Sequence, residues 1–189
     1  FTRETGIKVV YSTYESNEAM IAKIKLLKGK TYDVVCPSTY FIPQMVEAGL
    51  LAKLDHSKLP NMAQMDPRLM HQSFDPNNDY SVPYMWGTYG LIVNKKFAKG
   101  MNINSWQDLL RPEFKNRIML SDDPRDTIGM ALLANGFGPN STSEAELKKA
   151  FAFLDKIRPN VRVFDVTASK RAMVNEETYI GCIWNGDAE

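Results

Sequence analysis

The stretch "IKVVYSTYESNEAMIAKIKLLKGKTYDVVCPS", residues 7–38, places an amphipathic segment between two short apolar runs. The runs at 7–14 and 32–38 are rich in valine and tyrosine, which predicts two strands. The segment between them predicts a helix with Ser16 as its N-cap, Gly29 as its end and apolar residues at helical spacing, namely Met20, Ile21, Ile24 and Leu27. This order predicts parallel strands joined by a crossover helix, the repeating unit of an α/β fold.

The alternation of strands and helices continues along the chain. After a helix predicted at 40–51, a proline- and asparagine-rich surface excursion leads to an extended run that ends near Val93. The rhythm then restarts, with helices predicted from Ser105 and over 124–136, 143–157 (with a Ser143/Glu146 capping box) and 168–177, and strands over 118–120, 160–164 and 178–184. We expect two α/β lobes, at 1–88 and 92–189, joined by a β-linker at 89–91.

Composition excludes several classes of protein. With 44% hydrophobic residues, 24% charged residues and a net charge of +1, the chain has no global field that would favour nucleic acid or an anionic membrane. No apolar run approaches the length of a membrane span. The two cysteines, Cys36 and Cys182, lie in predicted strands and are expected to be buried free thiols. The chain opens at Phe1 on the last turn of a predicted helix and stops just after a strand, so we expect it to be part of a longer chain.

Three carboxylates gather after a predicted strand, at Asp122, Asp123 and Asp126. Asp123 before Pro124 is typical of a helix N-cap, and the helix dipole favours both Asp123 and Asp126. Capping does not account for Asp122, nor for the position at the carboxyl edge of a strand, where open α/β sheets bind ligands. The cluster therefore has two interpretations, a helix cap and a site for a cationic ligand.

Two further groups follow predicted strands in the same way. Ser38 and Tyr40 come directly after the run at 32–38, where Ser38 could cap the next helix or contact a ligand. Trp184 comes at the end of the run at 178–184, where it could be core or could cover a ligand ammonium group through cation–π attraction. Their coincidence on both sides of the predicted linker indicates a ligand cleft between two lobes.

Signals of catalysis or metal binding are weak. The only histidines, His56 and His71, lie in the irregular excursion, and no nucleophile, phosphate-loop or zinc motif is present. The segment "DPNNDY" at 75–80 begins like a calcium loop but lacks the required glycine and glutamate, so it is interpreted as an Asp/Asn turn. We expect no catalytic residue, no metal and no cofactor.

Four segments, "FTRETGIKVVYSTYESNEAMIAKIK", "YDVVCPSTYF", "FDPNNDYSVPYMWGT" and "IGCIWNGDA", resemble the spermidine/putrescine-binding proteins of bacterial polyamine ABC transporters, the PotD-like periplasmic substrate-binding proteins. The resemblance runs from Phe1 to Glu189 and implies a two-lobed periplasmic-binding-protein-like fold of type II, here a fragment truncated at both ends. It implies a protein that is periplasmic, or lipid-anchored in a Gram-positive host, and that delivers polyamines to a membrane permease.

The resemblance also implies a set of ligand-binding residues. Ser38 and Tyr40 match the family's "PSTY" segment, Asp123 matches an Asp that takes a ligand nitrogen, and Trp184 matches the Trp of "IWNG" that packs along the methylene chain. Asp126 stands where the spermidine binder has Glu, so the preference between spermidine and putrescine is left open. Two rivals remain, a binding protein of the same fold for another organic cation and an extracytoplasmic enzyme acting on an amine. Self-association of the truncated chain is also expected, because it would expose sheet edges.

Overall fold

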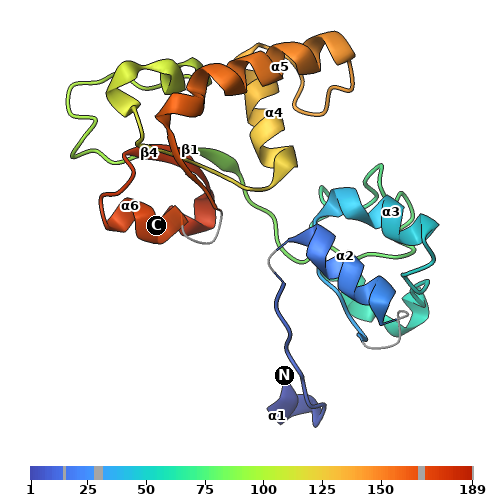
Figure 1. Cartoon of the computed structure of the whole chain (residues 1–189). Helices are drawn as coiled ribbons and strands as arrows, with labels where there is room; N and C mark the ends of the chain where they lie inside the picture. The colour runs from blue at the N-terminus through green and yellow to red at the C-terminus, as the bar shows by residue number, and fades with distance from the viewer. Residues whose placement is uncertain (15, 28–31, 166–168, 189) are drawn as a thin grey trace. The chain divides into compact units, whose positions relative to one another are not determined.

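The computed structural model describes residues 1–14, 16–27, 32–165 and 169–188. The chain divides into two compact units, Phe1–Trp86 and Gly87–Glu189 (Figure 1). The predicted linker at 89–91 forms the first part of strand β1 in the second unit. No helix in the described part of the chain is long and apolar enough to cross a membrane.

The first unit is built from short helices around a small apolar core. Its elements are α1 (Thr2–Thr5), α2 (Asn17–Leu26), η1 (Thr39–Phe41), α3 (Ile42–Glu47), η2 (His56–Lys58) and η3 (Pro60–Gln64). Helix α2 begins as predicted, since the Ser16 side chain accepts a hydrogen bond from the Ala19 backbone N–H. The core of this unit joins one face of α2 to η1 and α3, through Met20, Ile21, Ile24, Phe41 and Met45.

The predicted strands at 7–14 and 32–38 are wrong. Both segments are extended, yet neither pairs with a strand in the described residues, and Val10 and Val34 are 83% and 85% exposed. The Tyr14 hydroxyl donates a hydrogen bond to the Cys36 carbonyl, which joins the two segments at one point. Cys36 is exposed, against the expectation of burial. The sequence pattern shows that these residues suit a strand, but a strand also needs a hydrogen-bonded neighbour. Gly29, the predicted end of α2, lies outside the described residues.

The irregular excursion contains the Asp/Asn turn predicted at 75–80. The Asp75 carboxylate accepts hydrogen bonds from the backbone N–H groups of Asp79, Tyr80 and Ser81 and from the Ser81 hydroxyl. Burial raises the pKa of Asp75, but these donors outweigh it and hold the pKa below its ordinary value. Asp75 therefore serves as the hub of a turn, with its oxygens engaged by the protein itself.

The second unit contains a four-stranded mixed sheet in the order β1-β4-β2-β3. Its strands are β1 (Tyr89–Val93), β2 (Ile118–Leu120), β3 (Val161–Phe164) and β4 (Ile180–Trp184). Strand β2 is parallel to β3 and β4, as predicted, whereas β1 runs antiparallel to β4. Gly181 allows β2 and β4 to approach closely, because a Cβ atom there would lie 2.7 Å from the Met119 carbonyl oxygen.

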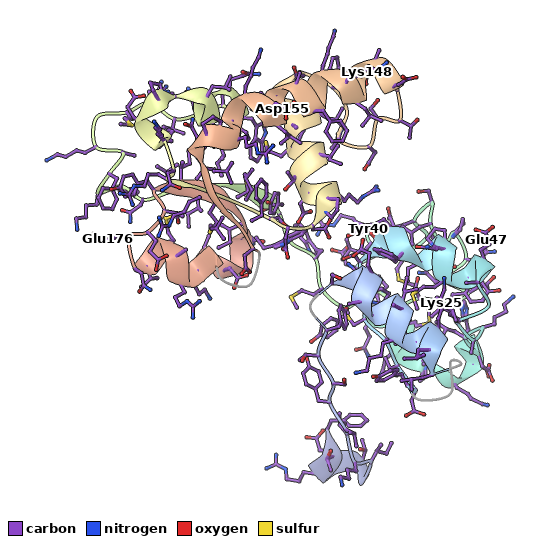
Figure 2. The ribbon with its side chains drawn as sticks, viewed as in Figure 1. Lys25, Tyr40, Glu47, Lys148, Asp155 and Glu176 are labelled. Atoms are coloured by element: carbon purple, nitrogen blue, oxygen red, sulfur yellow. The ribbon has the colours of Figure 1, made fainter. Side chains whose placement is uncertain are left out.

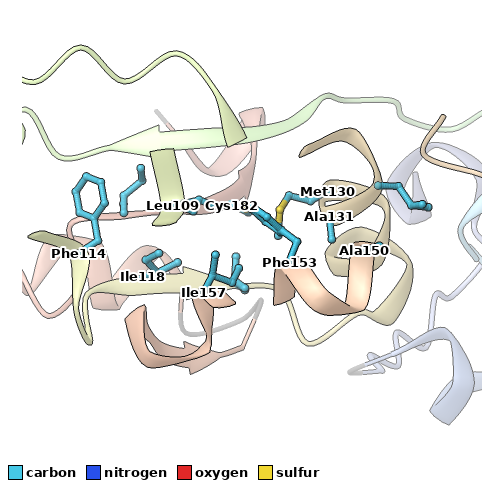
Figure 3. Packing of buried hydrophobic residues seen from close by; sticks show 12 residues of the cluster. Leu109, Phe114, Ile118, Met130, Ala131, Ala150, Phe153, Ile157 and Cys182 are labelled. Carbon is cyan, nitrogen blue, oxygen red and sulfur yellow. The ribbon is translucent and has the colours of Figure 1, made fainter. Parts of the chain in front are cut away.

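Helices cover both faces of this sheet. Helices α4 (Pro124–Ala134) and α5 (Glu144–Ile157) lie on one side and α6 (Ser169–Val174) on the other (Figure 1). The main core lies between the sheet and the first pair and includes Phe114, Ile118, Phe153 and Cys182 (Figure 3). Met119 faces α6, where it packs with Ala172 and Met173. Burial of this apolar area is the main force that holds the unit together.

The predicted helix starts at Ser105 and Ser143 differ in how well they agree with the structure. Ser105 and Asp108 form a capping box at η4 (Trp106–Leu110), which is followed by η5 (Pro112–Phe114). The capping box predicted for α5 is wrong, because the Ser143 side chain makes no capping hydrogen bond there. The chain is completed by η6 (Arg158–Asn160) and by η7 (Asn185–Asp187), which follows β4 directly.

Candidate ligand-binding site

Three chain segments of the second unit meet at one edge of its sheet. Strand β2 ends at Leu120 and β4 at Trp184, and the antiparallel β1 brings its first residue, Tyr89, into register with Trp184. The Tyr89 and Trp184 rings lie with their centroids 5.5 Å apart at 59°. Trp184 is 39% exposed, so part of its indole is available to a ligand. The edge therefore carries two packed aromatic rings, in which Tyr89 supports the more exposed Trp184.

The start of α4, which follows β2 closely, carries two carboxylates, of which Asp126 interacts electrostatically with Tyr89. Asp123 is the N-cap, as predicted, and accepts a hydrogen bond from the Arg125 backbone N–H at 2.8 Å. The Ser121 hydroxyl accepts from the Asp123 backbone N–H at 3.0 Å and donates to the Asp126 carboxylate at 3.3 Å. Capping thus explains Asp123, while Asp126, in the first turn, points back towards the end of β2.

Asp126 is an unusually basic carboxylate. Burial and, to a lesser degree, the neighbouring Asp123 raise the pKa of Asp126 to about 6, against the opposing effects of the Ser121 hydroxyl and Arg125. A carboxylate in such a position is short of compensating positive charge. A ligand that brings a cation to it would gain a strong, charge-assisted hydrogen bond.

Two buried groups lie at or near this edge, Tyr89 at the start of β1 and Cys182 within β4, and the sequence did not reveal the role of Tyr89. The Tyr89 hydroxyl is buried and makes no hydrogen bond within the described residues. Burial raises the pKa of Tyr89 well above its ordinary value of 10, with Cys182 and Asp126 raising it further and the nearby Ser121 backbone opposing them; none of these neighbours is at hydrogen-bonding geometry. Burial likewise raises the pKa of Cys182 to about 12, so this thiol stays protonated. The sequence around Tyr89 predicts only extended backbone. The pairing of β1 with β4 is what places Tyr89 opposite Trp184.

Ser38 and Tyr40 lie together in the first unit, where Figure 2 labels Tyr40. The buried side chain of Asn17 links them: its amide donates to the Ser38 hydroxyl at 3.1 Å and to the Tyr40 hydroxyl at 3.4 Å, and its oxygen accepts from the Ser38 backbone N–H at 2.9 Å. Ser38 precedes η1 but makes no capping hydrogen bond with its side chain, so the capping interpretation is wrong. Asn17 was missed because it reads as an ordinary first residue of a helix.

The structure thus groups the predicted residues as two sets, one in each unit. Ser38 and Tyr40 form the first set, and the start of α4 together with Trp184 forms the second. That one ligand contacts both sets stays a prediction from the sequence. Within the ranges that the structure describes, no group of three His, Cys, Asp or Glu side chains could hold a metal ion.

Comparison with known proteins decides the family. Residues 1–189 match the family described as bacterial extracellular solute-binding protein. The chain belongs to this family. The family is described by solute binding, which gives no support to the rival hypothesis of an amine-modifying enzyme.

Relatives within the family give a narrower picture. A spermidine/putrescine-binding periplasmic protein of Salmonella typhimurium is 46% identical over 188 residues, which cover 100% of this chain and 54% of that protein. A solved structure assigned to a spermidine/putrescine ABC transporter of Listeria monocytogenes is 43% identical with a TM-score of 0.91, covering 99% of this chain and 57% of that one. The TpPotD lipoprotein of Treponema pallidum is 31% identical with a TM-score of 0.88, covering 98% and 58%. The chain spans about half the length of the curated relatives it matches. The fold predicted from the resemblance is confirmed by these structures.

Proposed function

We propose that the protein carrying this chain is an extracytoplasmic receptor that binds spermidine or putrescine and delivers it to the permease of an ABC importer. The observation that carries the proposal is Asp126, a partly buried carboxylate with a pKa of about 6 at the same sheet edge as the Trp184 indole. Relatives that are 46% and 43% identical to this chain are named as spermidine/putrescine-binding proteins. A cationic ligand would add positive charge next to a carboxylate whose ionised form burial makes costly and Arg125 compensates only in part.

The chemistry of the residues suits a polyamine. Such a ligand consists of ammonium groups separated by methylenes. Asp123 and Asp126 would accept charge-assisted hydrogen bonds from an ammonium group, and Trp184 and Tyr40 would cover methylenes and attract the cations through their ring faces. Ser38 would add a hydroxyl that the Asn17 amide already orients. Binding of this kind needs no covalent step.

Calorimetric titration of spermidine and putrescine into the protein that carries this chain tests the proposal. We expect affinity in the micromolar range or tighter, about −8 kcal/mol. Asp126→Asn should weaken binding about 10- to 100-fold, since a hydrogen bond to a charged group contributes about 1.5–3 kcal/mol. Trp184→Ala should cost about 0.5–2 kcal/mol. Asp155→Asn, on the exposed side of α5 (Figure 2), is the matched control and should leave affinity unchanged.

The same titration separates the rival ligand class. If a panel of other organic cations contains one that binds more tightly than both polyamines, the protein is a receptor for that cation and the polyamine proposal is overturned. Equal polyamine affinity in the wild type and the Asp126→Asn variant would remove the chemical basis of the proposal.

We also propose that the protein works outside the cytoplasmic membrane, either in the periplasm or tethered by a lipid. The curated relatives are periplasmic proteins, and a structural relative is a lipoprotein. Fractionation of cells that express the protein, followed by immunodetection, should place it outside the cytoplasm. Recovery in the cytosolic fraction would contradict this location.

Self-association of the 189-residue chain is a further proposal. Val9, Val10 and Tyr11 are 57%, 83% and 85% exposed in an extended segment that pairs with no strand in the described residues. An exposed apolar segment of this kind is a template for pairing with a second chain. We expect light scattering to report a dimer. A 21.4 kDa monomer at micromolar concentration would exclude it.

A further inference from the structure

The fold of the second unit leaves the Tyr89 hydroxyl without a hydrogen bond within the described residues. The hydroxyl is buried, and the ring alone accounts for the packing against Trp184 at 5.5 Å. A buried hydroxyl without a partner destabilises a protein by about 1–3 kcal/mol. Such groups are uncommon and call for a specific reason.

The surroundings of this hydroxyl indicate what it is for. Asp126, Cys182 and the Ser121 backbone lie around it, and Asp126 is the one charged group among them. The Tyr89 phenol is neutral at physiological pH, and its oxygen has two lone pairs that can accept a hydrogen bond. The Asp126 carboxylate, which interacts electrostatically with this hydroxyl, is a second acceptor at the same sheet edge. The two acceptors match a group with several N–H donors and a positive charge.

We propose that Tyr89 is a specificity-determining residue of the polyamine site, whose hydroxyl accepts a hydrogen bond from the same terminal ammonium group that Asp126 binds, while its ring positions Trp184. This inference rests on the proposed function and narrows it to a substrate class. A primary ammonium group carries three N–H donors and can serve the carboxylate and the phenol together. A quaternary ammonium group carries none, and an acetylated amine has lost its charge.

Tyr89→Phe separates the hydroxyl from the ring, because the ring packing on Trp184 remains. We expect putrescine affinity to fall at least fivefold and the unfolding midpoint to stay the same or rise slightly. Tyr179→Phe is the matched control: that ring stacks on Phe97 with centroids 3.8 Å apart and should tolerate the change with less than twofold effect on binding.

A double-mutant cycle shows whether the two groups hold one ammonium group. In the Asp126→Asn background, Tyr89→Phe should lower putrescine affinity less than twofold, because the ammonium group that both residues bind is no longer held in place by the carboxylate. An equal loss in both backgrounds would overturn the proposal, as would an effect below twofold in the wild-type background. The bis-trimethylammonium analogue of putrescine should bind the wild type at least tenfold more weakly than putrescine, and equal binding would also overturn it. Absence of any polyamine binding by the wild type would instead reject the proposed function, and this inference with it.

Discussion

Replacing Asp126 by Asn should make the protein more stable while it weakens ligand binding. The pKa of Asp126 is about 6 in the folded protein against an ordinary value of 3.8, so the folded state holds this proton more tightly than the unfolded state does. By linkage, the ionised carboxylate destabilises the fold at neutral pH, and that penalty disappears as the pH falls from about 6 towards 4. Asn is neutral at every pH and escapes the penalty.

The magnitude follows from the size of this pKa change. At about 1.4 kcal/mol per pKa unit, the penalty has an upper limit of about 3 kcal/mol, and solvent screening of a partly exposed side chain reduces it to about 1–2 kcal/mol. Asn also weakens the hydrogen bond from Ser121 and the favourable interaction with the start of α4, which together offset about 0.5 kcal/mol. We expect a net stabilisation of about 1 kcal/mol at pH 7.5, or about 3 °C in Tm.

Urea denaturation of Asp126→Asn and the wild type between pH 7.5 and pH 4.5 measures this effect, with Asp155→Asn as the control for removal of an exposed carboxylate. The stability difference should be largest above pH 7 and should shrink steadily below pH 6. A variant that is less stable than the wild type at pH 7.5 would refute the reasoning, and so would a difference that does not change with pH. Either result would mean that the Asp126 carboxylate is already compensated within the protein.

Three other predictions follow from the same structure. Polyamine affinity should be constant above about pH 7 and should fall by up to tenfold per pH unit below about pH 6, because Asp126 must be ionised to bind; calorimetry over this range should show no such step in Asp126→Asn. Asp75→Ala should lower the free energy of unfolding by about 2–4 kcal/mol, since several half-buried donors lose their acceptor, and a change below about 0.5 kcal/mol in urea denaturation would contradict the turn's structural role. Gly181→Ala should destabilise by about 2 kcal/mol or more, because its Cβ would lie 2.7 Å from the Met119 carbonyl oxygen, whereas Gly90→Ala has open space and is the control for the same measurement.

Local chemistry explains which parts of the candidate site were predictable. The start of α4 was predicted correctly, because Asp123 and Pro124 specify a helix N-terminus through contacts within a few residues. The N-cap of α2 at Ser16 was predicted correctly for the same reason. The strands predicted at 7–14 and 32–38 failed because strand formation depends on a neighbour that the segment's own residues do not identify.

The sequence by itself determined the starts of helices α2 and α4, the negative charge at the start of α4 and the family to which the chain belongs. Each of these is written in adjacent residues or in motifs. Only the tertiary structure decided that Tyr89 pairs with Trp184, that its hydroxyl is buried without a partner, and that the pKa of Asp126 rises to about 6. These properties come from burial and from the pairing of β1 with β4, which bring together groups distant in sequence. Desolvation depends on everything that surrounds a group in space, so no pattern along the chain encodes it.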